Sequence, residues 1–201
     1  MKLFKFQNLK EYKKIQQNKA SKQLFHQDGE MYHWVTEKEA EMIAKHFLQN
    51  SSKKELGICH GSKIGYEVNL FRKLLNFNII GTDIGDFANK YPNMIQHDFH
   101  DVKAEWVDNV DFIYTNSLDH SYDPLKALNT WRESLHKDGI MYIEWSSYHN
   151  VVNQTDCFGA ELDEYKKLIK DANMNISTII HVPENKNEFY KTERFVLACS
   201  K

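Results

Sequence analysis

The residues with types and spacing suited to chemistry gather between Glu55 and Asp83. A short apolar run is followed by a turn that contains three glycines, and a second apolar run ends on Asp83. The glycines of this stretch are Gly57, Gly61 and Gly65. Glycines let a backbone approach a ligand closely, a helix N-terminus offers N–H groups, and an acid that ends a strand accepts hydrogen bonds from ribose hydroxyls. This pattern predicts a nucleoside site.

Two more polar segments follow predicted strands. His97 to Asp101 comes after the run 94–96, and Asn116 to His120 comes after the run 110–115. Because a histidine can take up a proton near neutral pH, His120 is a candidate general base or substrate contact. A loop histidine that caps the next helix is the structural alternative. The acids and histidines of 97–101 resemble metal ligands, but neighbours on an extended segment point to opposite sides, so we predict no metal site.

Alternating strands and helices must position these residues. Strands are predicted at about 54–59, 77–82, 94–96, 110–115, 140–145, 177–182 and 194–199. Helices are predicted from Lys63 to Leu75, at 86–90, from Asp123-Pro124 to Asp138-Gly139 and at about 160–171. This alternation predicts a parallel sheet with helices on both faces, and the closing pair of strands, joined by a hairpin-like connection near Pro183, adds one antiparallel strand.

The first 52 residues predict a helical extension ahead of the main domain. Apolar residues recur at helical spacing between Leu9 and Leu24, and Thr36 with Glu39 forms a capping box for a second helix that reaches about Asn50. We therefore predict an N-terminal lid or substrate cap over 1–52 and one domain over 53–201. Tyr32 and Trp34, between the two helices, either cover the ligand or fix the first helix to the core.

The composition excludes several classes of protein. The chain has 201 residues and 41% hydrophobic content, which suits one well-packed domain. Its 26 Lys and Arg against 28 Asp and Glu argue against a nucleic-acid partner. The three cysteines form no CxxC pair, which predicts a reducing compartment. The chain contains no apolar run near the ~20 residues of a membrane span and no signal-peptide core, so we expect a cytoplasmic protein without membrane contact.

The motifs and their order resemble those of class I S-adenosylmethionine (SAM)-dependent methyltransferases over about residues 53–201. Glu55 to Gly61 is similar to that family's first motif, and Asp83 is similar to its ribose-binding acid. Asp98 resembles the acid that contacts the adenine amino group, and the segment 111–120 resembles the fourth-strand motif. Lys137 to Met141 resembles the family's turn into strand five.

The resemblance implies an α/β, Rossmann-like, doubly wound and mostly parallel seven-stranded sheet with a terminal antiparallel hairpin strand, preceded by N-terminal helices. It implies SAM as the cofactor and methyl transfer to an unidentified, small-molecule acceptor. The cofactor-binding residues would be Gly57, Cys59, His60, Gly61, Asp83, Ile84, Asp98, Phe99, Asn116 and Ser117. Candidates for catalysis are His120 and Asn116, and candidates for substrate contact are Trp34, Trp145 and His149. The oligomeric state stays open, a homodimer included.

One departure and two rival functions remain. Cys59-His60 fills the middle of the loop where most relatives have a glycine, which suggests a subgroup marked by Cys-His-Gly. Tyr122 and Lys126 match the Tyr-x-x-x-Lys pair of NAD-dependent short-chain dehydrogenases, but Pro124 lies between them and the pair follows strand four directly. A non-catalytic nucleoside-binding or interaction module on the same fold is the other alternative, because a fold does not fix a function.

Overall fold

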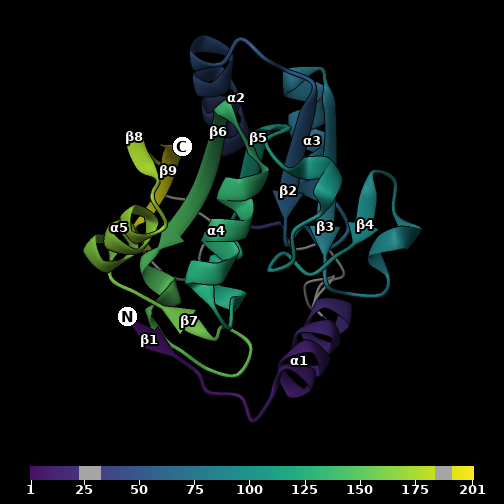
Figure 1. The fold of residues 1–201 in the computed structure, drawn as a ribbon, viewed down its shortest axis with the longest axis vertical. Coiled ribbons are helices and arrows are strands. Elements are labelled where there is room, and N and C mark those ends of the chain that lie inside the picture. Colours follow the sequence, from purple (N-terminus) through teal and green to yellow (C-terminus); the bar gives the residue numbers. More distant parts are fainter. Residues whose placement is uncertain (23–32, 184–191) are drawn as a thin grey trace.

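The computed structural model describes residues 1–22, 33–183 and 192–201, and its centre is a seven-stranded sheet (Figure 1). The strand order is β4-β3-β2-β5-β6-β9-β8, and only β9 runs antiparallel to its neighbours. The strands span Met94–Gln96 (β4), Asn78–Asp83 (β3), Leu56–His60 (β2), Val110–Thr115 (β5), Leu135–Ser146 (β6), Arg194–Ser200 (β9) and Asn175–His181 (β8). The predicted seven-stranded, mostly parallel sheet with a closing hairpin is confirmed.

Helices cover both faces of this sheet. On one face α2 (Glu37–Asn50) and α3 (Tyr66–Leu75) pack through a cluster that includes Phe47 and Phe71. On the other, α4 (Pro124–Ser134) and α5 (Leu162–Asp171) pack through a cluster that includes Trp131. Strands buried on both faces read as continuous apolar runs, which explains why the sequence signalled them so clearly.

The helix starts follow their sequence signals. Thr36 caps α2, and its hydroxyl oxygen accepts a hydrogen bond from the Glu39 N–H at 3.2 Å. Asp123 caps α4 in the same way, accepting from the Lys126 N–H at 3.0 Å, and Pro124 occupies the first turn. Such a cap contributes about 1 kcal/mol to stability, because it satisfies an N–H that the helix leaves without a partner.

The predicted end of α4 is wrong. The helix ends at Ser134, not at Asp138-Gly139, and β6 begins at once with Leu135. The pairing of β5 with β6 then shifts register between Val110 and Phe112. A Cβ on Gly139 would lie 2.8 Å from the Val110 carbonyl oxygen. This glycine is therefore needed where an irregular strand passes close to its neighbour, and not at a helix end.

The N-terminal segment runs along the carboxyl edge of the sheet. In Figure 1, α1 (Leu9–Lys22) lies below the ends of the parallel strands. The chain before it forms a small sheet that the sequence did not predict, in which β1 (Lys2–Leu3) pairs with β7 (Phe158–Gly159). Short 3-10 helices complete the loops: η1 (Ala88–Lys90), η2 (Ala104–Trp106), η3 (Leu118–His120) and η4 (Ser147–Asn150). Of the helices described, none has the length and apolar character to cross a bilayer.

Candidate functional site

The glycine loop after β2 is pressed against the segment that follows β5. Gly61 has φ +73°, and a Cβ at this position would lie 2.4 Å from the Ser117 hydroxyl oxygen. Lys63 also has a positive φ, of 48°, and Gly65, with φ +84°, caps α3. Only glycine fits the combination of backbone angle and close approach at Gly61. The loop is thus held at the carboxyl edge, where parallel α/β sheets bind ligands.

Asp83 fixes this loop from the neighbouring strand. One of its carboxylate oxygens accepts the Lys63 N–H at 2.9 Å, and the other accepts the Gly85 N–H at 2.8 Å. Burial raises the pKa of Asp83 above its ordinary value, and these two hydrogen bonds oppose the shift. Each carboxylate oxygen can accept a second hydrogen bond. Asp83 therefore braces the loop and still has capacity for hydroxyl groups of a ligand.

Asp98 lies after β4, and its side chain is only 9% exposed. Its Oδ1 accepts hydrogen bonds from the His100 backbone N–H at 3.1 Å and from His100 Nδ1 at 2.8 Å. Its Oδ2 forms an ion pair with Lys13 Nζ at 2.9 Å. Burial raises the pKa of Asp98, but the hydrogen bonds from His100 and Lys13 outweigh it and hold the pKa below its usual range. The carboxylate is ionised at neutral pH.

The two residues predicted beside these acids lie close to them. Phe99 is half-buried, and its ring meets Trp131 edge-on at 5.3 Å. Ile84 is also half-buried, and its carbonyl oxygen accepts from Gln17 Nε2 at 3.3 Å. Apolar side chains at these places can pack against the two faces of a planar ring.

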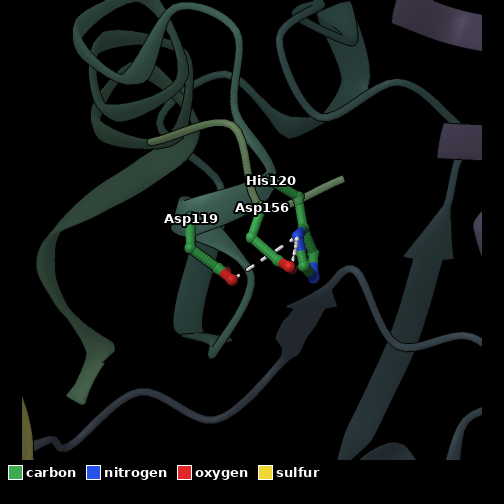
Figure 2. A group of neighbouring side chains, drawn as sticks. All are labelled: Asp119, His120 and Asp156. Carbon is green, nitrogen blue, oxygen red and sulfur yellow. Dashed lines mark ion pairs between the residues drawn. The ribbon is translucent and has the colours of Figure 1, made fainter. Parts of the chain in front are cut away.

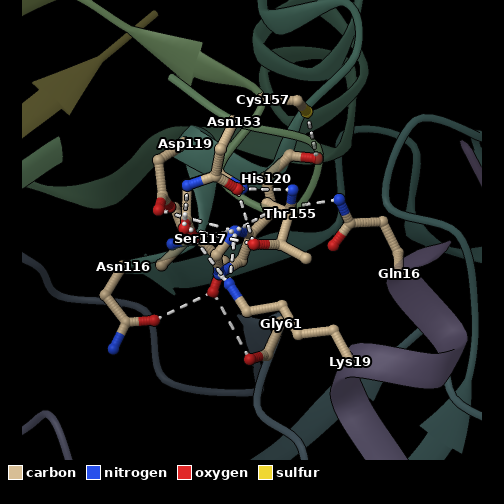
Figure 3. A network of polar contacts seen from close by, with 12 residues as sticks. Gln16, Lys19, Gly61, Asn116, Ser117, Asp119, His120, Asn153, Thr155 and Cys157 are labelled. Atoms are coloured by element: carbon tan, nitrogen blue, oxygen red, sulfur yellow. Dashed lines mark hydrogen bonds and ion pairs between the residues drawn. The ribbon is translucent and has the colours of Figure 1, made fainter. Parts of the chain in front are cut away.

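The end of β5 is tied to the glycine loop (Figure 3). The Ser117 hydroxyl donates to Asn116 Oδ1 at 3.0 Å and lies 3.4 Å from the Gly61 carbonyl oxygen. The Thr115 hydroxyl donates to the His60 carbonyl oxygen at 3.2 Å. The structure thus brings the predicted residues of the first and fourth motifs together.

His120 belongs to a compact group with Asp119 and Asp156 (Figure 2). Its Nδ1 lies 3.5 Å from an Asp119 carboxylate oxygen, 3.4 Å from Asp156 Oδ1 and 3.0 Å from the Thr155 carbonyl oxygen. Lys19 Nζ is 2.6 Å from Asp156 Oδ1 and 3.4 Å from each ring nitrogen of His120. The side chains of Asp119, His120 and Asp156 have the mutual spacing of metal ligands. In this conformation the Lys19 ammonium supplies the positive charge beside the two carboxylates. From the sequence, the ligand-like residues were expected at 97–101 instead.

Helix α1 contacts most of the segments that carry the predicted site. The Tyr12 hydroxyl donates to the His120 carbonyl oxygen at 3.1 Å, and Gln16 Nε2 donates to the Thr155 carbonyl oxygen at 3.0 Å. Together with the bonds of Gln17, Lys13 and Lys19, these contacts reach the chain after β3, β4, β5 and β6. α1 covers the carboxyl edge of the sheet.

Two predicted cofactor residues lie in the core instead of at this edge. Gly57 is inside β2, where a Cβ would lie 2.9 Å from Ile79 Cγ1. Cys59 is fully buried in the cluster beneath α2 and α3, and burial raises its thiol pKa well above the ordinary value. Both are corrected to packing positions, because strand alternation turns them toward that core.

His60 is buried on the opposite face of β2. Its Nδ1 lies 2.9 Å from the Thr82 hydroxyl oxygen, and its ring stacks on Trp131 with centroids 5.3 Å apart. Burial, followed by the nearby charges of His97 and His100, lowers the pKa of His60 to about 3. The imidazole is therefore neutral and shapes the start of the loop by packing.

The predicted substrate residues lie in different environments. Trp145 is 4% exposed, and its indole N–H donates to the Ala160 carbonyl oxygen at 2.9 Å, so it is a core residue and not a pocket wall. Trp34 donates its indole N–H to a Glu144 carboxylate oxygen at 2.6 Å. His149 lies in η4, but its side chain is outside the described residues, as is Tyr32.

Sequence reasoning missed a buried charged network next to Trp34. Arg194 donates to Glu144 through Nε at 2.7 Å and to Glu39 through a terminal nitrogen at 2.9 Å. The Tyr114 hydroxyl also donates to Glu144, at 3.0 Å. Burial and the Glu144 charge raise the pKa of Glu39 well above its ordinary value, against the effect of Arg194. A glutamate within the apolar strand 140–145 was the one available signal.

The dehydrogenase pair is present as a contact but in a different setting. Lys126 Nζ lies 3.4 Å from the Tyr122 hydroxyl, although Tyr122 precedes α4 and Pro124 begins it. Pro124 thus keeps the pair from lying on one helix face, although the two side chains still meet. The antiparallel β9 between β6 and β8 is the stronger reason to set this alternative aside.

Comparison of the sequence with models of protein families and with curated protein sequences gives no match. Solved structures do match. A SAM-dependent methyltransferase from Aquifex aeolicus is 14% identical, with a TM-score of 0.60 over 97% of this chain and 98% of that chain. Geranyl diphosphate C-methyltransferase from Streptomyces coelicolor A3(2), in complex with Mg²⁺, geranyl diphosphate and S-adenosylhomocysteine (SAH), is 10% identical, with a TM-score of 0.67 over 94% and 97%.

A third solved structure belongs to the same class. It is the 1,6-didemethyltoxoflavin-N1-methyltransferase of Burkholderia thailandensis with bound SAH, 13% identical with a TM-score of 0.64 over 82% of this chain and 77% of that chain. Identities this low carry information about the fold alone. With its strand order and its antiparallel β9, the chain has the fold of the class I SAM-dependent methyltransferases.

Proposed function

We propose that this protein binds SAM at the carboxyl edge of β2, β3, β4 and β5 and transfers its methyl group to a small-molecule acceptor. The observation that carries the proposal is the position of Asp83, a buried carboxylate that ends β3 and holds the glycine loop through the Lys63 N–H. An ionised Asp98 lies two residues after the next strand along the edge, β4. Two acids on adjacent strand ends, beside a glycine loop, suit a ribose and an adenine amino group.

The residues at the edge fit the parts of this cofactor. Asp83 would accept hydrogen bonds from the ribose hydroxyls, and Asp98 would accept one from the adenine amino group. Ile84 and Phe99 would pack against the adenine, while Gly61, Asn116 and Ser117 would line the methionine part. Bound SAM supplies a methyl group that its sulfonium already activates, so the chain mainly has to align the acceptor and exclude water.

The acceptor side of the proposal rests on His120 and α1. His120 ends η3, immediately after the β5 segment that meets the glycine loop. Its imidazole would take the proton that leaves the acceptor as the methyl group arrives. α1 would act as a lid that admits the acceptor and then closes over it, while α2 stays packed on the sheet.

Isothermal titration calorimetry with SAH and with NADH tests the cofactor. We expect SAH to bind, NADH not to bind, and Asp83→Ala to weaken SAH binding by at least about tenfold, since hydrogen bonds to a charged group are lost. Asp86→Ala, at an exposed position three residues on, is the matched control. Equal affinity of the Asp83 variant and wild type would refute the assignment, and binding of NADH alone would favour the dehydrogenase.

A separate assay distinguishes an enzyme from a binding module. SAM labelled in its methyl group is incubated with the protein and with pools of small-molecule alcohols, amines and acidic carbon compounds. We expect label in at least one pool. Tight SAH binding without label in any pool would support the non-catalytic alternative.

A further inference from the structure

A line of hydrogen bonds behind Asp98 joins two loops of the carboxyl edge. His100 Nδ1 is 2.8 Å from Asp98 Oδ1, and His100 Nε2 is 2.7 Å from the Ser121 hydroxyl oxygen. His100 is 1% exposed and Ser121 is fully buried. The two residues follow different strands: His100 comes after β4, and Ser121 comes after β5 and the short helix η3.

The Asp98 end of this line fixes the direction of the hydrogen bond between His100 and Asp98. The Asp98 carboxylate can only accept, so Nδ1 of His100 carries a proton and donates it. On the other side of the ring, Nε2 is hydrogen-bonded with the Ser121 hydroxyl, whose oxygen accepts the Asp123 backbone N–H at 3.2 Å. The line of hydrogen bonds therefore connects Asp123, at the start of α4, with Asp98.

The order Asp, His, Ser is also that of a hydrolytic triad, but this serine is not placed as a nucleophile. Its hydroxyl is enclosed, with no exposed surface. The rings of Tyr12 and Tyr122 pack against His100, with centroids 5.9 Å and 4.2 Å away. The His100 carbonyl oxygen is held as well, by the Thr130 hydroxyl at 3.1 Å. Every contact of His100 serves to hold it still.

We propose that His100 is a positioning residue for cofactor recognition, which orients Asp98 so that its Oδ2 accepts the adenine amino group. His100 supplies both hydrogen bonds to Oδ1, one from its backbone and one from its ring. The carboxylate is thereby fixed in one rotamer, and Oδ2 faces α1, where Lys13 reaches it. This inference rests on the proposed function, since it assigns selectivity for adenine to an arrangement behind the site.

A matched pair of variants separates the two ring nitrogens. In His100→Asn the side-chain amide nitrogen replaces Nδ1 and can still donate to Asp98. In His100→Gln the longer side chain reaches toward Ser121 and loses the donor at Asp98. The probes are SAH and its 6-deamino analogue, in which purine replaces adenine, and the measured quantity is the ratio of their dissociation constants.

For wild type we expect SAH to bind at least about tenfold more tightly than the deamino analogue, as for a hydrogen bond to a charged group. His100→Asn should keep most of this ratio, and His100→Gln should reduce it to about twofold or less. A purely structural role would weaken both ligands equally and leave the ratio unchanged, which would overturn the proposal.

Two further measurements keep the outcomes distinct. Thermal unfolding shows whether each variant is folded. If His100→Gln does not fold, Ser121→Ala provides the test, because it releases Nε2 while leaving Asp98 and His100 intact. For this variant we expect the ratio of the two dissociation constants to be two- to threefold smaller than in wild type. An unchanged ratio would overturn the proposal. Failure of wild type to bind SAH at all would refute the proposed function itself, whereas binding with no preference for the amino group would refute the role of His100 alone.

Discussion

Removal of the Lys13 charge should strengthen cofactor binding. Lys13 holds Asp98 Oδ2, the oxygen that would accept the adenine amino group. An adenine amino group that approached this oxygen from the side of α1 would take the place of the Lys13 ammonium, so this ion pair would have to break before Asp98 could serve the ligand. The substitution Lys13→Met keeps most of the length of the side chain and its packing but removes the ammonium group.

The size of the effect follows from the exposure of the pair. The Lys13 side chain is 36% exposed and that of Asp98 is 9% exposed. Ion pairs that reach solvent contribute about 0.2–1 kcal/mol, and the burial of Asp98 favours the upper end. Because 1.4 kcal/mol is a factor of ten in affinity, we expect Lys13→Met to tighten SAH binding by up to about fivefold.

Calorimetry at two salt concentrations gives the assay. Between 0.1 and 1 M NaCl the screening length falls from about 10 Å to about 3 Å, so wild type should bind SAH more tightly at high salt while Lys13→Met changes little. Lys14→Met, an exposed neighbour on the same helix, is the control and should behave as wild type. If Lys13→Met binds SAH more weakly than wild type, Lys13 is part of the cofactor site and the competition is refuted.

Three other predictions concern polar groups of the site and of the core. His120→Ala should reduce methyl transfer by about a hundredfold while sparing SAH affinity, and unchanged turnover would make His120 structural. Arg194→Met should lower the free energy of unfolding, measured with urea, by about 3–5 kcal/mol, because Glu144 and Glu39 lose their shared partner. The double variant Arg194→Met with Glu39→Gln should recover part of this free energy, because one of the two unpaired charges is removed. Burial raises the pKa of Glu67 to about 7 from 4.5, so the stability it contributes is fully present below pH 4.5 and is lost as pH rises through 7. Glu67→Gln should therefore reduce the loss of unfolding free energy between pH 5 and pH 8, by as much as about 3 kcal/mol relative to wild type.

The sequence predicted the fold well because the information it needed was local. Each central strand is an apolar run, and the caps at Thr36 and Asp123 mark helix starts within a few residues. The mistake at Asp138-Gly139 has the same origin. An Asp-Gly pair after a helix is a common end signal, but here the reason for Gly139 is the carbonyl of Val110, which is 29 residues away and on another strand.

The candidate site was less predictable because its side chains are fixed by contacts between distant segments. Asp83 and Asp98 could be found, since Asp83 ends a strand and Asp98 follows the next strand closely. The partners of Asp98 could not: Lys13 is on a helix whose position no local pattern encodes, and the link from His100 to Ser121 crosses from one loop to another. Gly57 and Cys59 failed for a different reason, because a glycine or a small thiol in a strand next to a loop serves packing as readily as ligand contact.

The attachment of α1 bears on how such a site would open. Within the described chain, neither of the two core clusters includes a residue of α1. Tyr12 is the main apolar anchor of the helix, because its buried ring packs against His100 and Tyr122. The other contacts are polar: hydrogen bonds to backbone carbonyls from Tyr12, Gln16 and Gln17, and ion pairs of Lys13 and Lys19. Water and salt can replace such bonds at small net cost, whereas exposing a core cluster would cost about 25 cal/mol for each Å². We therefore propose that α1 can leave the carboxyl edge while the sheet stays folded, which is what a lid over a bound cofactor would require.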